Sequence, residues 1–252
     1  MNLRTLAHAC VAAALLTTLP GSVVAGTFTI SPLRVDFGGT TRTAALTVRN
    51  DEPVPVVVQA EALAWSQESG QDDLAPSRDL LVSPVVFTLA PGGSQLVRVA
   101  LRREADGSRE LTYRLTLQEV PQAASPQFTG LQVALRLSVP VFVAPRAPAE
   151  PQLVWAASRA ASGTVTVTAR NDGAAHARLQ GFALKTADGR ATLLEQPALA
   201  YVLPGATRRW TFDDDSLATA SSGSAVTGAG PVRLEATTER GAVVAELALT
   251  AE

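Results

Sequence analysis

The sequence predicts an all-β protein built from two immunoglobulin-like β-sandwich domains that meet at an angle and leave a cleft between them. Short runs of alternating apolar and polar residues, separated by Gly, Pro, Asn and Asp, fill the chain after its N-terminal segment. Two motifs recur in the same order in the two halves of the chain. A proline-rich stretch separates these halves, and prolines in such number cannot lie inside a central strand.

Six runs in the first half have the alternation of a strand, because successive side chains of a strand point to opposite faces of the sheet. Turn residues separate these runs at intervals of about 8–12 residues, which is typical of sandwiches. Helical periodicity is not sustained anywhere over about ten residues. The expected strands are Thr43–Asn50, Val54–Trp65, Val85–Leu89, Gln95–Leu101, Leu111–Val120 and Leu131–Val143.

An internal repeat indicates two domains of one kind. Leu46–Asp51 reads LTVRND, and Val167–Asp172 reads VTARND. Further along each half, Leu89–Gly92 and Val202–Gly205 each end in Pro-Gly and lead into another strand-like run. Such turns are common singly, but two in matching order favour a repeated sandwich of about 100 residues.

Composition divides the chain into four segments. Arg4, the apolar run Ala9–Leu19 and the small residues up to Ala25 have the order of a secretory signal peptide. Three prolines among residues 145–151 make a short, stiff connection. We therefore expect a signal peptide at 1–25, an N-terminal Ig-like domain at 26–144, a Pro-rich linker at 145–151 and a C-terminal Ig-like domain at 152–252.

Charge and cysteine content exclude several classes of protein. The formal net charge of −2 gives no electrostatic reason for binding nucleic acid. The apolar run near the N-terminus is too short to span a bilayer, so we expect no membrane insertion. The single cysteine, Cys10, lies in the signal peptide, so an exported protein without disulfides is expected.

Catalysis and cofactor binding have little support. Beyond the signal peptide the only histidine is His176, which a catalytic triad would have to use. We expect it in a solvated loop or at the start of a strand. The acidic run Asp213–Asp215 lacks the spaced ligands and the glycine of a calcium loop, so we expect an exposed turn. The sequence thus predicts a binding protein with no cofactor and no metal.

The run from Leu131 to Val143 has a continuous apolar face. Its odd-numbered positions are all Leu or Val, whereas the even-numbered positions are mostly small or polar and only Phe142 is large and apolar. Such a ridge can pack inside its own sandwich, or it can be lent to another protein that lacks a strand. The residues alone leave both interpretations open.

Several stretches of the N-terminal domain together match a known pattern. They are Ile30–Phe37, Val48–Asp51, Leu89–Val99, Glu110–Leu115 with Glu119–Pro121, and Leu131–Leu135 with Phe142–Pro145. By these stretches, which occur in the family's order and cover about the whole domain, the domain resembles the periplasmic chaperones of chaperone–usher pilus assembly. The C-terminal domain is similar by position and type rather than by motif.

This resemblance implies a periplasmic protein that stabilises pilin (fimbrial) subunits by donating a strand and delivers them to an outer-membrane usher. Main-chain hydrogen bonds extend the sheet of the subunit, and alternate side chains fill its groove. By position, the donor residues are Leu131, Val133, Leu135 and Leu137. Val139, Val141 and Val143 fit the chaperone's own core better. An unpaired apolar edge also favours self-association of the free protein.

The resemblance also implies a carboxylate anchor. In the family, an arginine on the first strand holds the C-terminal carboxylate of the subunit, and Arg34 matches its position. The family's partner lysine falls at Pro140, which supplies neither a cation nor an N–H group. Either another cation joins Arg34 or the register is set differently. The candidate cations are Arg98, Arg114 and Arg136.

A second departure concerns the domain interface. Glu110 matches a family position at this interface, but its usual arginine partner falls at Ala144, which leaves Arg146 as a substitute. These departures indicate a divergent branch, similar to the spore-coat-U-associated, archaic-type pilus systems.

Two other classes of function compete with a chaperone. The first is a secreted two-domain Ig-like adhesion or carbohydrate-binding module, but an aromatic content of 5% provides no obvious sugar platform. The second is an exported hydrolase that uses a pair of carboxylates, and no such pair stands out beyond the acidic run.

Overall fold

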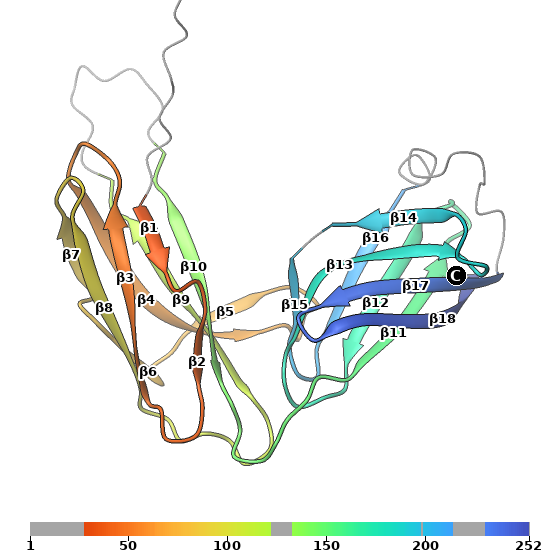
Figure 1. The fold of residues 1–252 in the computed structure, drawn as a ribbon, viewed down its shortest axis with the longest axis horizontal. Coiled ribbons are helices and arrows are strands. Elements are labelled where there is room, and N and C mark those ends of the chain that lie inside the picture. Colours follow the sequence, from red (N-terminus) through yellow and green to blue (C-terminus); the bar gives the residue numbers. More distant parts are fainter. Residues whose placement is uncertain (1–27, 122–132, 198, 214–229, 252) are drawn as a thin grey trace, which may run out of the picture.

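The computed structural model describes residues 28–121, 133–197, 199–213 and 230–251. The predicted signal peptide and Leu131 lie outside these ranges. The described residues form eighteen strands in two bodies that diverge from a common base (Figure 1). None of them forms a helix of the length and apolarity needed to cross a membrane. The all-β prediction with two Ig-like domains is confirmed.

The N-terminal domain is a sandwich of two sheets. One sheet has the order β1 (Phe28–Ser31), β3 (Thr43–Asn50), β8 (Ser94–Leu101) and β6 (Leu80–Ser83). The other has the order β2 (Val35–Phe37), β10 (Arg136–Val143), β9 (Leu111–Glu119), β4 (Val56–Ser66) and β5 (Asp73–Pro76), with β7 (Val86–Leu89) also paired to β4.

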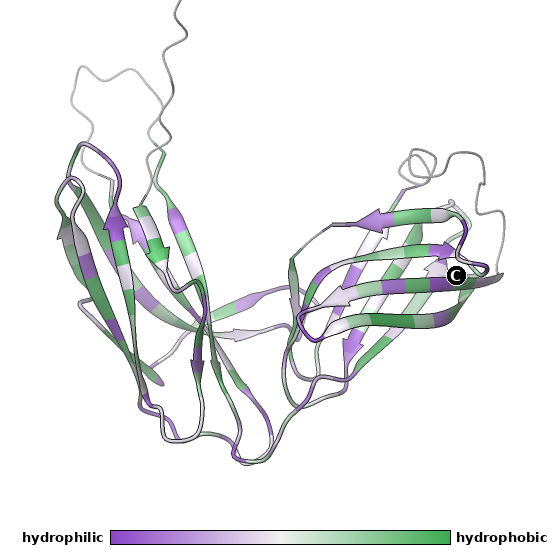
Figure 2. Ribbon diagram, in the orientation of Figure 1, coloured by the Kyte–Doolittle hydropathy of each residue, from purple (hydrophilic) through white to green (hydrophobic). Residues whose placement is uncertain are grey.

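The core of this domain lies between its two sheets. Leu46 and Val97 from one sheet and Leu115 and Val141 from the other have no exposed surface. Hydrophobic and hydrophilic residues alternate along these strands, as the sequence pattern predicts (Figure 2). Burial of apolar area therefore supplies most of the stability of a domain that contains no disulfide.

The strand expected from Leu131 to Val143 begins instead at Arg136. The cause is the length of its neighbour, because Arg136 pairs with Gln118 and β9 ends one residue later, at Glu119. A hydrogen bond from Glu119 N to Leu135 O, 2.8 Å long, is the last backbone link. Alternation of side chains thus continues in the sequence beyond the point where strand pairing ends.

The strands of the C-terminal domain are hydrogen-bonded into one curled path of seven strands, with an eighth strand paired beside it. Its order is β14 (Thr192–Gln196), β13 (Ala177–Thr186), β17 (Gly230–Thr238), β18 (Gly241–Ala251), β11 (Leu153–Arg159), β12 (Val165–Asn171) and β16 (Thr207–Phe212), with β15 (Ala200–Val202) on β13. The path folds back on itself, because the rings of Phe182 on β13 and Trp210 on β16 are 5.0 Å apart across the core.

All strands of the first two sheets precede residue 144, and all strands of the third follow residue 152. The described residues between them contain no strand. This arrangement supports the proposed division of the chain at the proline-rich linker.

The repeated motif has a structural basis in a buried asparagine. Asn50, at the end of β3, has no exposed surface. Its Nδ2 donates to the carbonyls of Val54 at 2.8 Å and Leu89 at 3.2 Å, and its Oδ1 accepts from the backbone N–H of Glu52. The side chain thus links the end of one strand to the approach of the Pro-Gly turn.

Asn171, at the end of β12, makes the same links in the other domain. Its Nδ2 donates to the carbonyls of Ala175 at 2.8 Å and Val202 at 2.9 Å. In both copies one acceptor lies four residues after the asparagine, and another lies two residues before the proline. The turn glycines, Gly92 and Gly205, have φ values of +66° and +71°, which favour glycine.

Candidate functional site: an open strand edge beside an interdomain cleft

The two domains meet through an apolar cluster. Trp65 at the end of β4 and Phe142 near the end of β10 are buried against Leu203 and Ala206 of the C-terminal domain. The ring of Tyr201 lies 5.5 Å from those of both Trp65 and Phe142. The cluster therefore joins residues of the two domains into one packed group. The angle between the domains is therefore held by a packed interface in addition to the linker.

Hydrogen bonds reinforce the same interface. Gln67, whose side chain is buried, donates from Nε2 to Tyr201 O at 3.1 Å and accepts at Oε1 from Leu203 N at 3.0 Å. Arg208 contacts Asp72 at 3.2 Å, and Arg109 donates to the carbonyl of Pro204. Because the bonds of Gln67 and Arg109 join a side chain of one domain to the main chain of the other, they restrict sliding as well as separation.

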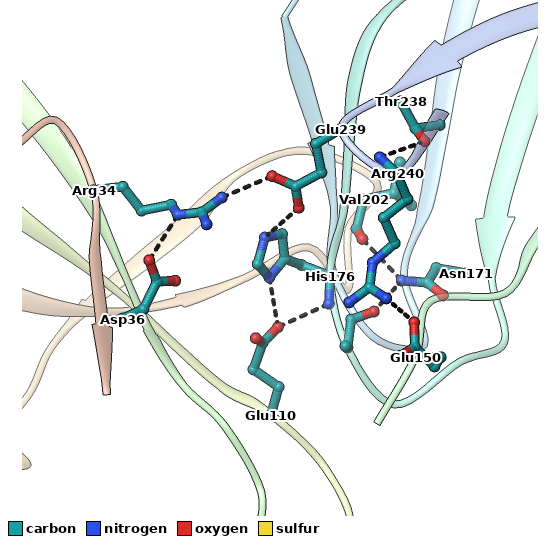
Figure 3. Close-up of polar contacts among 11 residues, drawn as sticks. Arg34, Asp36, Glu110, Glu150, Asn171, His176, Val202, Thr238, Glu239 and Arg240 are labelled. Carbon is teal, nitrogen blue, oxygen red and sulfur yellow. Dashed lines mark hydrogen bonds and ion pairs between the residues drawn. The ribbon is translucent and has the colours of Figure 1, made fainter. Parts of the chain in front are cut away.

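A chain of charged and polar side chains crosses the cleft (Figure 3). Arg34, on the connection between β1 and β2, donates from Nη1 to Glu239 Oε2 at 2.7 Å. The other oxygen of Glu239 lies 3.4 Å from His176 Nε2. On its far side, His176 Nδ1 lies 2.8 Å from Glu110 Oε2. Arg34 and Glu110, at the two ends of this chain, belong to the N-terminal domain, and Glu239 and His176 between them belong to the C-terminal domain.

Arg34 remains a cation in this environment. Burial disfavours the charged guanidinium, but hydrogen bonds to Glu239 and Asp36 outweigh that effect and raise the pKa of Arg34 above its usual value. Nε donates to Asp36 Oδ2 at 2.8 Å, and the side chain is still 36% exposed. A guanidinium that is charged and partly exposed in a cleft is suited to binding a carboxylate.

The expectation of a solvated His176 is wrong, because the residue is only 7% exposed. It lies just before β13, and its ring stacks on Phe142 of β10 at a centroid distance of 3.6 Å. Its backbone N–H also donates to Glu110 Oε2 at 2.8 Å. The C-terminal domain covers the end of β10, and this contact excludes solvent from the histidine.

Glu110 lies between the domains, where its partner is His176. Its own N–H donates to Ala174 O at 2.9 Å, which adds a backbone link across the interface. Arg146, the expected substitute partner, has an exposed side chain, and its backbone N–H donates to Asp106 O. Within the described residues, no hydrogen bond or ion pair joins Arg146 to Glu110.

The three candidate cations lie in different places. Arg98 is exposed on β8, in the other sheet of the N-terminal domain. Arg114 lies over the ring of Trp65 at 3.6 Å in the domain interface, and desolvation lowers its pKa. Arg136 is exposed at the start of β10. Within the described residues, the structure brings none of the three into contact with Arg34.

Among the residues that the structure describes, one edge of β10 is open along most of its length. On this side the described partner of β10 is β2, which pairs with it in parallel from Val141 to Val143. The backbone bonds of Leu135 with Glu119 and of Ala144 with Phe37 fix the directions of the peptide groups. Odd-numbered residues bond to β9, so even-numbered residues direct their N–H and C=O groups to the other side. Arg136 and Ser138 therefore present backbone donors and acceptors along the open edge.

Pro140 lies on this same edge. Arg114 is its register partner on β9, but as an even-numbered residue Pro140 would direct its N–H away from β9. Proline has no N–H, so the ladder to β2 cannot continue beyond Val141. Arg34 immediately precedes Val35, the partner of Val141, so it lies beside Pro140 where β2 leaves β10.

Side chains of the apolar face divide into two groups along β10. Val139, Val141 and Val143 are buried in the core of the N-terminal domain, as expected. Leu135 and Leu137 are partly buried against that core, and Val133 is 75% exposed. Leu131 lies outside the described residues. The ridge therefore emerges from the core toward the open end of the strand.

Glu239 and the buried role of His176 were missed by the sequence reasoning. Glu239 lies in a β-turn with no recognisable motif, so no local signal marks it. Phe142 did carry a signal, because it is the only large apolar residue on the polar face of its run. A large apolar residue on that face indicates that something covers it, and the cover is the C-terminal domain.

No group of three or more His, Cys, Asp and Glu side chains in the described parts of the chain is arranged to hold a metal ion. Asp213 is exposed, and the two aspartates after it lie outside the described residues. Of the three tryptophans, Trp65 belongs to the domain interface, and Trp155 and Trp210 pack in the core of the C-terminal domain.

Comparisons with known proteins show which family and which solved structures this chain is similar to. Residues 27–149 match the family described as "Pili and flagellar-assembly chaperone, PapD N-terminal domain". No curated protein matches the sequence. Among solved structures, the chain is similar to the CsuC–CsuE chaperone–tip adhesion subunit pre-assembly complex from archaic chaperone–usher Csu pili of Acinetobacter baumannii. That match has 21% identity and a TM-score of 0.64, and it covers 90% of this chain and 99% of the other.

Two further structures are similar at 19% identity with a TM-score of 0.56. The chaperone DraB of E. coli is covered to 97%, over 90% of this chain. The complex of the SafA pilin with the SafB chaperone of Salmonella enterica is covered to 96%, over 89% of this chain. At these identities the structural similarity establishes the fold, and the family match covers the domain that carries the open edge.

Proposed function

This protein is a pilus-assembly chaperone whose residues 27–149 belong to the PapD N-terminal-domain family, and we propose that it holds pilin subunits through the open edge of β10. A subunit strand added to this edge would continue the six-stranded sheet, as in strand addition generally. The observation that carries the proposal is the edge itself, which β2 covers only from Val141 to Val143.

The backbone geometry specifies how a partner strand would pair. Arg136 and Ser138 offer N–H and C=O groups on the open side, and Pro140 ends the ladder. The apolar side chains for the groove of the subunit are Leu131, Val133, Leu135 and Leu137. Each that becomes buried would contribute about 1.5–3 kcal/mol before the cost of ordering.

Arg34 supports the proposed anchor for the C-terminal carboxylate of a subunit. It is charged, partly exposed and adjacent to Pro140, where the open ladder ends. A subunit strand that lies along Arg136–Val139 and ends at Arg34 must run parallel to β10. Pro140 thus limits the register of the subunit strand on β10. The family lysine at this position would instead contribute to the register as a second cation.

Further parts of the proposal concern location and partners. We place the protein in the periplasm, acting by binding without catalysis and delivering subunits to an outer-membrane usher, as the family implies. The same open edge would let two free copies pair with each other. Sedimentation of the free protein that depends on its concentration, and that changes to the one-to-one complex when subunit is added, would support this pairing.

Co-expression with the pilin-like proteins of the same genome tests the proposal. A soluble one-to-one complex with subunit should form with the wild type and be lost with Leu135→Glu, which places a charge on the ridge. Ser138→Pro is a second variant that removes an N–H from the open edge without touching the core or the ladder to β9.

Val154→Glu, at an exposed apolar position on β11, is the matched control and should leave the complex unchanged. Subunits that stay soluble without this protein, or that bind all variants equally, would contradict the proposal. Glycan binding in the same preparation would then favour an adhesion module.

A further inference from the structure

The guanidinium group of Arg34 already binds two carboxylates of the protein itself. Nε donates to Asp36 Oδ2 at 2.8 Å, and Nη1 donates to Glu239 Oε2 at 2.7 Å. Asp36 lies two residues along the same segment, whereas Glu239 comes from the turn between β17 and β18 of the C-terminal domain (Figure 3). A carboxylate that arrives from outside therefore meets a guanidinium with two internal partners.

Glu239 has a second set of contacts to which it can turn. Its Oε1 lies 3.4 Å from His176 Nε2, a buried nitrogen without a hydrogen bond. A cavity of about 200 Å³ adjoins it and is lined by His176, Thr238 and Arg240, among others. The side chain of Glu239 is 24% exposed, so neither packing nor burial fixes it against Arg34.

We propose that Glu239 is an internal competitor for Arg34 and that the C-terminal carboxylate of a subunit displaces it. The inference rests on the proposed role of Arg34 as the anchor. Displacement exchanges one ion pair of Arg34 for another, and Glu239 turns toward His176 and the adjoining cavity. Because the number of ion pairs stays the same, the electrostatic gain from the incoming carboxylate is small.

This exchange determines selectivity and ease of release. A subunit with a correctly placed terminal carboxylate can replace Glu239, whereas a chain end that presents no charge at this point leaves the internal pair intact. When the subunit departs, Glu239 binds Arg34 again, so the guanidinium of the free chaperone regains its second carboxylate partner beside Asp36.

A two-tag competition tests the proposal. Wild-type protein and Glu239→Gln carry different affinity tags and are co-expressed with one untagged pilin-like subunit from the same genome. The amide keeps the size of the side chain but removes the competing charge. We expect about two- to five-fold more subunit on Glu239→Gln, the size of effect that one exposed ion pair produces.

Two controls isolate the carboxylate exchange. In an Arg34→Ala background the same comparison should give a ratio of one, because nothing remains to compete for. Glu195→Gln, at an exposed carboxylate of β14, should also give a ratio of one in the wild-type background. Glu239→Ala provides a second variant, and thermal melting of each free protein checks its folding.

Equal or lower capture by Glu239→Gln and Glu239→Ala overturns the proposal and assigns Glu239 a purely structural role between the domains. A gain that persists without Arg34 overturns it as well. If wild-type protein captures no subunit, the proposed function itself is wrong and the inference falls with it. These outcomes are distinguishable in one experiment.

Discussion

Asn50 and Asn171 each link a strand end to a Pro-Gly turn, and these two asparagine corners have the same hydrogen bonds but different surroundings. The corner at Asn50 lies in the N-terminal domain, and its Pro91 is exposed. The corner at Asn171 lies in the C-terminal domain, where Pro204 is buried and Leu203 packs against the other domain. One repeated device thus closes a sandwich in both copies and in addition joins the domains in the second.

The difference depends on few residues. The position before the proline is Ala90 in the first corner and Leu203 in the second. Leu203 adds its side chain to Trp65 and Phe142, and the carbonyl of Pro204 accepts from Arg109. Among the described residues, the turn with the small exposed Ala90 makes no contact in the domain interface, whereas the turn with the large apolar Leu203 is part of it.

The largest expected effect tests what the corners share. Asn50→Ala and Asn171→Ala should each lower the free energy of unfolding by about 4 kcal/mol, because each leaves several buried carbonyls and N–H groups unpaired. Chemical denaturation of the two variants measures this. If only one of them is strongly destabilised, the corners are not equivalent.

The second prediction tests what separates the corners. Leu203→Ala should cost about 3 kcal/mol through the cavity left in the domain interface, and the domains should then unfold in separate steps. Ala90→Leu at the matching exposed position should stay within about 0.5 kcal/mol of wild type. Calorimetry distinguishes one transition from two, and equal effects at both positions would contradict the comparison.

The smallest effect concerns the turn glycines. Gly92→Ala should cost about 1 kcal/mol, because alanine disfavours a φ of +66°. Gly205→Ala should cost more, because its Cβ would lie 2.7 Å from Arg109 Nη2 and disturb the bond to Pro204. The two midpoints of urea unfolding give the difference. Identical midpoints would show that the side chain of Arg109 moves aside with no loss of stability.

Much of the fold was predictable, because alternation and turn residues act locally. The strand Thr43–Asn50 has the predicted bounds, and the repeated Asn-Asp and Pro-Gly motifs correspond to equivalent corners. The start of β10 was not predictable, since the alternation continues past the last residue of β9 that can pair with it. Strand pairing depends on the length of the neighbour, which the strand's own sequence does not contain.

The candidate site, like the fold, has features that the sequence predicts and features that it does not. The sequence by itself determined the apolar ridge and the proline within it, because these follow from residue type and position along one strand. Arg34 lies on a distant segment, and its place beside Pro140 depends on the pairing of β2 with β10. Only the tertiary structure decided that His176 is buried on Phe142 and that Glu239 occupies Arg34. These contacts join residues from two domains, and neither domain's sequence specifies what the other presents across the cleft.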